Sequence, residues 1–212
     1  MLKLLKICFL CVLVPSLVAC DEEEVPNNST SFPEIGKPIA FDYDSSFTNS
    51  FQDTYYEMDL AFYIPPGIAE LKNRPLMFTL STLRNSSVAG SLLTVIEEQD
   101  MIAVSPLNGN QNQFKAVLES LIESEYIDPE RVYVAGFSNG GRDIFSLAWE
   151  VQDKVKGAIL LDPSNIFAGD PLEDSRLSVC IVCQEDRVGQ YGGSVSQLNQ
   201  KGIKSRIIGV EG

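Results

Sequence analysis

One short segment carries residue types that could perform nucleophilic chemistry. Residues 136–141 are Gly-Phe-Ser-Asn-Gly-Gly, which contains the pattern G-x-S-x-G. A serine in this pattern stands on a sharp turn between a strand and a helix, so that its Oγ is presented above the edge of a sheet. The flanking glycines, Gly136 and Gly140, avoid the clashes that larger side chains would cause in that turn. Ser138 is therefore a candidate nucleophile, while the alternative interpretation is a glycine-rich turn without chemistry.

The chain contains no histidine in its 212 residues. No imidazole is therefore available as a general base or as a metal ligand. A serine without its base loses most of its nucleophilicity, on the order of 10⁴ to 10⁶ in rate by analogy with triad knock-outs. No lysine is placed to substitute convincingly for the missing base, and the sequence indicates no cofactor and no metal site.

The elements that must position Ser138 follow from the hydrophobic pattern. An apolar run over 132–135 leads into the motif as a strand, and a helix over 143–151 follows it. Further strands are expected over 55–64, 76–80, 101–104, 158–161, 177–183 and 203–210, and further helices over 86–99, 114–122 and 195–201. Short strands that alternate with helices predict an α/β fold, with a mostly parallel sheet covered by helices on both faces.

Residues 127–141, Ile-Asp-Pro-Glu-Arg-Val-Tyr-Val-Ala-Gly-Phe-Ser-Asn-Gly-Gly, resemble the nucleophile region of α/β-hydrolases. The resemblance is closest to the secreted esterases grouped with polyhydroxybutyrate depolymerases and feruloyl or acetylxylan esterases. It is sharp only over this segment and extends weakly from about residue 55 to the end of the chain. The resemblance implies that Ser138 is the nucleophile and that the backbone N–H of Asn139 is one oxyanion donor.

Two further stretches resemble parts of the same family. Residues 74–80 resemble the strand before its His-Gly oxyanion loop, but Ser81 and Thr82 stand where His-Gly is expected. The second oxyanion donor would be the N–H of Leu83. Residues 186–191 resemble the acid loop, which makes Asp186 the candidate triad acid, although an exposed loop carboxylate is an equal alternative. Asp162, in a plain turn signal after the preceding strand, is the second choice.

The family carries its catalytic histidine on a loop after the last strand, before a final helix. Here the last expected strand ends near residue 210, and the sequence given ends at Gly212. The fold is thus expected to lack the histidine loop and the last helix, either as a fragment or as a natural short form. Two functions stay open. One is a serine esterase acting on extracellular esters such as polysaccharide esters, nearly inactive as given. The other is a non-catalytic, hydrolase-like binding lipoprotein.

The first residues have the character of a targeting segment. Residues 1–19 combine two lysines with a short apolar run and end in Leu-Val-Ala before Cys20, which resembles a bacterial lipobox. The resemblance implies that Cys20 is lipidated and anchors the protein to the outer membrane of a bacterial cell envelope; an ordinary secretory signal is the alternative. Residues 20–38 are expected to form an acidic, Pro/Asn/Ser-rich tether, and residues 39–212 the hydrolase-like domain. The acidic run 21–24 is either a surface-export signal or a solvated linker.

The net charge of the chain excludes one class of partner. With 29 acidic and 16 basic residues, the net charge of −13 argues against nucleic acid. The expected partners are an ester substrate, small or polymeric, and a membrane reached through the lipid anchor.

Cys180 and Cys183 fall within one apolar strand and are expected to be core thiols that point to opposite faces of the sheet.

Overall fold

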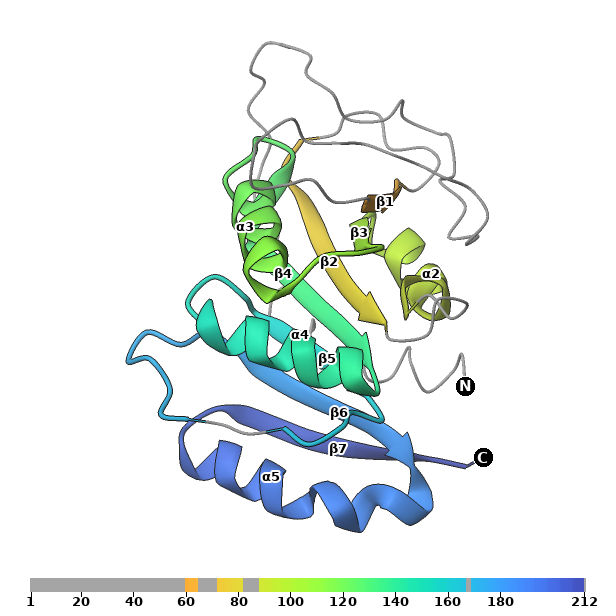
Figure 1. The fold of residues 1–212 in the computed structure, drawn as a ribbon, viewed down its shortest axis with the longest axis vertical. Helices are drawn as coiled ribbons and strands as arrows, with labels where there is room; N and C mark the ends of the chain where they lie inside the picture. Colours follow the sequence, from red (N-terminus) through yellow and green to blue (C-terminus); the bar gives the residue numbers. More distant parts are fainter. Residues whose placement is uncertain (1–59, 65–71, 82–87, 167–168, 212) are drawn as a thin grey trace.

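The computed structural model describes residues 60–64, 72–81, 88–166 and 169–211. These residues form a mixed sheet of seven strands in the order β1-β3-β2-β4-β5-β6-β7. β1 runs antiparallel to β3, and all other neighbouring strands are parallel. The predicted α/β fold with a mostly parallel sheet is confirmed (Figure 1). The predicted signal peptide, the tether and residues 39–59 of the predicted domain lie outside the described residues.

Strands and helices alternate along most of the chain. The elements in chain order are β1 (Leu60–Tyr63), β2 (Arg74–Ser81), α2 (Val88–Glu98), β3 (Ile102–Pro106), α3 (Gln111–Ile122), β4 (Ile127–Phe137), α4 (Asn139–Glu150), β5 (Gly157–Leu161), β6 (Ser178–Gln184), a 3-10 turn η2 (Glu185–Arg187), α5 (Val188–Gln200) and β7 (Lys204–Val210). Within the described residues, no helix is long and apolar enough to cross a membrane.

Each face of the sheet has its own buried cluster, because side chains alternate along a strand. On one face, Val132 and Val134 of β4 pack with residues of α3, α4 and α5. Those three helices lie along the same side of the sheet in Figure 1. On the other face, Tyr133 and Ala135 pack with residues of α2. The central strand β4 is therefore buried on both sides, which fixes the strand that leads into Ser138.

The parallel strands bring their carboxyl ends to one edge of the sheet. Phe137 at the end of β4 pairs with Leu161 at the end of β5, and Leu161 pairs with Val182 near the end of β6. Gln184 at the end of β6 then pairs with Val210 at the end of β7. Residues that directly follow these strands must therefore lie along a single edge, the usual location of binding sites in open α/β sheets.

Several element boundaries differ from the sequence-based expectation. β4 begins at Ile127 rather than at 132, which lengthens the strand before Ser138. α4 begins directly after Ser138, earlier than the predicted start at 143. α5 begins at Val188 rather than at 195, so most of the predicted acid loop is helical. Glycines in the first turns of α5 hide the helical pattern in the sequence. The helix nevertheless forms because its apolar residues, including the buried Tyr191 and Leu198, pack against the sheet.

The two cysteines of β6 occupy opposite faces of the sheet. Cys180 belongs to the cluster that contains α2 residues, whereas Cys183 belongs to the cluster with α3, α4 and α5. Both are free thiols and both are buried. The prediction that they are core thiols that do not bridge each other is confirmed.

Gly192 allows a test of whether the segment 188–200 is helical in solution. Gly192 is exposed within α5, and a Cβ added there would meet no atom within 4 Å. Gly192→Ala should therefore raise the free energy of unfolding by about 0.5–1 kcal/mol, because alanine loses less backbone entropy in a helix. Urea unfolding followed by circular dichroism measures the change. A loss of stability would show that the segment is not helical in solution.

Candidate active site

Ser138 occupies the turn between β4 and α4 with a backbone conformation that a non-glycine residue rarely adopts. Its φ is 54° and its ψ is −121°. Its N–H donates to Leu161 O of β5 at 3.0 Å, and its carbonyl accepts from the N–H groups of Arg142 (3.2 Å) and Ser164 (2.9 Å). Such strain persists only where the surroundings enforce it, and it gathers at functional sites. The half-buried Ser138 makes no side-chain cap to the helix.

The glycines of the motif are explained by direct contact. A Cβ built on Gly136 would lie 2.3 Å from Gly140 O and 2.8 Å from the Gly141 nitrogen, so only glycine fits at this position. A Cβ on Gly141 would lie 3.0 Å from Pro163 Cβ and 3.1 Å from Gly136 O. The strand, the turn and the first residues of the helix are therefore packed backbone against backbone, as the motif predicts.

The backbone N–H of Asn139, the predicted oxyanion donor, lies at the N-terminus of α4 directly after Ser138. Asn139 is the first residue of α4, so its backbone N–H has no acceptor within the helix. The partial positive charge of the helix terminus favours a negative charge beside this group. The exposed Asn139 side chain accepts a hydrogen bond from Ser164 Oγ. Leu83, the predicted second donor, lies outside the described residues.

The two candidate acids lie in different surroundings at the same edge. Asp162 directly follows β5, has φ 43°, and forms an ion pair with Arg187. Its carboxylate also accepts from the Tyr191 hydroxyl at 3.1 Å. Asp186 lies in η2, directly after β6, and is exposed. The carboxylate of Asp162 is thus already held by partners, whereas that of Asp186 faces solvent.

Tyr191 lies beneath this ion pair with its hydroxyl in a polar cluster. The hydroxyl shares its one proton between Pro163 O at 2.8 Å and Asp162 Oδ1 at 3.1 Å, and its oxygen accepts from Arg187 Nη2 at 3.2 Å. Burial, followed by the hydrogen bond to Asp162, raises the pKa of Tyr191 to about 12. Burial and then the charge of Asp162 also raise the pKa of the Cys183 thiol. Both groups are therefore protonated at neutral pH, so neither serves as a ready proton acceptor for Ser138.

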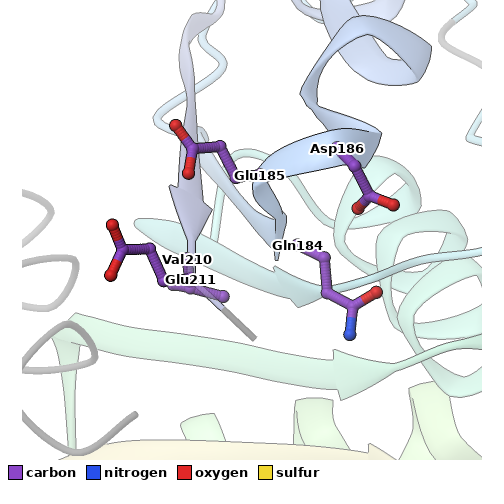
Figure 2. A pocket seen from close by; sticks show the side chains of 5 residues that line it. All are labelled: Gln184, Glu185, Asp186, Val210 and Glu211. Carbon is purple, nitrogen blue, oxygen red and sulfur yellow. The ribbon is translucent and has the colours of Figure 1, made fainter.

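A cavity of about 580 Å³ opens beside Asp186, between the ends of β6 and β7. It is lined by Gln184, Glu185, Asp186, Val210 and Glu211. Figure 2 shows the carboxylate of Asp186 on the same side as the Gln184 amide, with the carboxylates of Glu185 and Glu211 on the other side. The lining is acidic, so the cavity favours a neutral or cationic occupant over an anionic one.

The structure thus places three predicted site residues after three neighbouring strands: Ser138 after β4, Asp162 after β5 and Asp186 after β6. Neither the contacts of Ser164 nor the ion pair of Arg187 with Asp162 is predicted from the sequence. The turn signal Asp-Pro-Ser at 162–164 marked the first segment as a loop after a strand. No local signal indicates that Arg187 reaches Asp162, because the contact joins residues far apart in the sequence.

Comparison of the structure with known structures shows the fold. FrmB, an S-formylglutathione hydrolase from Staphylococcus aureus, matches with 12% identity over 73% of this chain and 85% of that chain, with a TM-score of 0.55. Est1E from Butyrivibrio proteoclasticus matches with 16% identity over 73% and 85%, with a TM-score of 0.52. MGS-M1, an α/β-hydrolase enzyme from a Medee basin deep-sea metagenome library, matches with 14% identity over 76% and 78%, with a TM-score of 0.59.

These similarities confirm the α/β-hydrolase-like fold. At such low identity they carry no conclusion about chemistry. No protein-family model and no curated protein sequence matches the chain.

The contacts of Gly136 predict a large effect of a single methyl group. Gly136→Ala places a Cβ 2.3 Å from a backbone oxygen that cannot move without breaking the start of α4. We expect the free energy of unfolding to fall by about 3 kcal/mol or the chain to fail to fold, at the upper end of overpacking effects. Urea unfolding, with Gly192→Ala as the control for adding a methyl group in open space, measures this. Wild-type stability of Gly136→Ala would contradict the described turn.

Proposed function

We propose that this chain is a serine esterase-like hydrolase in which Ser138 is the nucleophile. The observation that carries the proposal is the backbone of Ser138, with φ 54° and ψ −121° between a buried strand and a helix N-terminus. A turn of this kind exposes a serine Oγ at the sheet edge beside unpaired helix N–H groups, an arrangement suited to acyl transfer. The fold of the compared esterases supports the proposal, as does the G-x-S-x-G motif.

The described residues suit the first half of an ester cleavage. Ser138 Oγ would attack the ester carbonyl carbon, and the carbonyl oxygen would become an oxyanion facing the Asn139 N–H. The new C–O bond requires that Oγ lose its proton, and collapse of the intermediate requires that the leaving alkoxide gain one. Asp186 is exposed at the same edge and could orient a base, but a carboxylate in water is a weak base for a hydroxyl. With no histidine in these 212 residues, proton transfer should limit the rate.

The proposed substrates are extracellular esters, small or polymeric, with polysaccharide esters as one class. Est1E, one of the structures with the same fold, has been solved with ferulic acid bound. The acidic cavity beside Asp186 disfavours esters of strongly anionic acids at that end of the site.

A missing base can be supplied from solution, which gives a direct test. Free imidazole at tens of millimolar should raise the turnover of a small activated ester by residues 1–212 by about tenfold or more, a small part of what a positioned base contributes. Ser138→Ala should abolish the protein-dependent part of this rate, which is obtained by subtracting hydrolysis by imidazole alone. Asp186→Asn should weaken the response to imidazole if Asp186 orients the base.

Ser146 provides the matched serine control, because it is exposed on α4 and its Oγ bonds only within the helix, to Arg142 O at 3.1 Å. Ser146→Ala should behave as the wild type. Equal protein-dependent rates for Ser138→Ala and the wild type, with and without imidazole, would refute the proposed nucleophile.

The absence of histidine favours a second candidate function, a hydrolase-like lipoprotein that binds a ligand or partner without catalysis. The two candidates differ in one observable. A binding protein needs no activated serine, so imidazole should give it no Ser138-dependent turnover. The strained Ser138 backbone favours the esterase, because this turn geometry exposes a serine Oγ beside a helix N-terminus, as acyl transfer requires.

We also propose that the protein is held at a bacterial outer membrane by lipid on Cys20. The Leu-Val-Ala-Cys sequence at residues 17–20 and the acidic, proline-containing stretch after it support this placement. The tether would then hold the hydrolase-like domain away from the lipid surface.

Mass spectrometry of the membrane fraction should find the peptide that begins at Cys20 carrying a diacylglyceryl group. Cys20→Ser should move the protein out of the membrane fraction, because the lipid is its only proposed anchor. Cys8→Ser is the matched control, since Cys8 leaves with the signal peptide. Recovery of the protein only in soluble form, with a different first residue, would contradict the lipid anchor.

A further inference from the structure

The loop that follows β5 lies directly against the turn that carries Ser138. Ser164 N–H donates to Ser138 O at 2.9 Å, and Ser164 Oγ donates to the Asn139 side chain. Pro163 lies so close to Gly141 that a Cβ on that glycine would be 3.0 Å from Pro163 Cβ. The loop therefore contacts the proposed nucleophile and the residue that carries the oxyanion donor.

The same loop is held from its other side by η2 and α5. Asp162 pairs with Arg187 of η2, and the Tyr191 hydroxyl of α5 is 2.8 Å from Pro163 O and 3.1 Å from Asp162 Oδ1. The Arg187 guanidinium also lies 5.8 Å from the centre of the Tyr191 ring. Tyr191 is only 6% exposed and packs in the hydrophobic core, so the position of its hydroxyl is fixed by the core.

Asp162 itself adopts a left-handed backbone, with φ 43°. Such a backbone is unfavourable for a residue with a Cβ and persists only where contacts hold it. Its N–H is bound to Val182 O at 2.7 Å, which fixes one side of the residue. The carboxylate contacts with Arg187 and Tyr191 fix the other side.

We infer that Arg187 is a positioning residue, whose pairing with Asp162 holds the loop 162–164 against the Ser138 turn and holds η2, the turn of Asp186, at the same edge. It follows that the carboxylate of Asp162 holds the loop in place through Arg187 and Tyr191 and is not the triad acid. The inference rests on the proposed function only where it concerns the reactivity of Ser138. The packing of the loop can be tested by itself.

The first measurement is amide hydrogen exchange of the full chain, which does not depend on any activity. Arg187→Met removes the guanidinium contacts with Asp162, Tyr191 and Gln190 and keeps the apolar stem. We expect the Ser164 amide, which donates to Ser138 O, to exchange about tenfold faster than in the wild type. The amide of Ile159 in the middle of β5 should be unchanged, which separates a local opening from a global loss of stability. Arg187→Lys should restore much of the protection, because the ion pair with Asp162 is kept.

The second measurement is the rate at which a fluorophosphonate modifies Ser138 in the presence of free imidazole, followed by intact mass. We expect Arg187→Met to be modified about tenfold more slowly, since a small displacement of a reacting group lowers its rate strongly. Arg187→Lys should be modified at close to the wild-type rate. Asp162→Asn and the double variant with Arg187→Met should each slow the reaction as much as Arg187→Met alone, because all three break the same contact.

Lys154 provides a matched control ion pair at the opposite edge of the sheet. It follows α4 and pairs with Glu119 at 2.9 Å, with side chains 36% and 31% exposed, against 33% and 25% for Arg187 and Asp162. Lys154→Met should change neither Ser164 exchange nor the modification rate.

Ser164 protection in Arg187→Met equal to the wild type would overturn the inference. Faster exchange with an unchanged modification rate would also overturn it, because the loop would then not position Ser138. If the wild type is not modified at all, the proposed function fails, and the exchange data alone decide whether Arg187 holds the loop.

Discussion

The strained backbone of Ser138 is the constraint on which the rest of the site depends. A non-glycine residue with φ 54° and ψ −121° costs of order 1–3 kcal/mol. It is held by a hydrogen bond to β5, by two hydrogen bonds to its carbonyl, and by the direct contact of Gly136 with Gly140. The hydrogen bond to β5 requires that β4 and β5 be in register, and the contact of Gly136 with Gly140 requires that α4 begin at Asn139. The sheet and the first turn of the helix are therefore what present the serine.

The elbow could be predicted because its determinants are local. A buried strand, glycines two residues on either side of a serine, and a following helix all lie within one short stretch of sequence. The parallel order of strands then predicts that Asp162 and Asp186 share an edge with Ser138. The start of α5 could not be predicted in the same way, because Gly189, Gly192 and Gly193 disfavour a helix that tertiary packing nevertheless stabilises. The contact of Arg187 with Asp162 could not be predicted either, because it joins residues far apart in the sequence.

The turn supplies groups that can stabilise an oxyanion, but it supplies no proton acceptor for Ser138. The helix N-terminus and the Asn139 N–H can stabilise negative charge on an ester oxygen, but they accept no proton. Tyr191 and Cys183, the nearby groups with raised pKa values, hold their protons at neutral pH. The exposed Asp186 beside the acidic cavity could orient a base that these 212 residues do not include. This combination is why the proposed esterase should turn over esters slowly with these 212 residues alone.

A crystal structure of the chain after prolonged reaction with a fluorophosphonate in the presence of imidazole tests directly whether Ser138 is the nucleophile. We predict a covalent bond between phosphorus and Ser138 Oγ, with a phosphoryl oxygen within hydrogen-bond distance of the Asn139 backbone N–H. The Ser138 backbone should keep its positive φ. An adduct on another residue would exclude Ser138 as the nucleophile, and a phosphoryl oxygen that points away from the N-terminus of α4 would exclude Asn139 as the oxyanion donor.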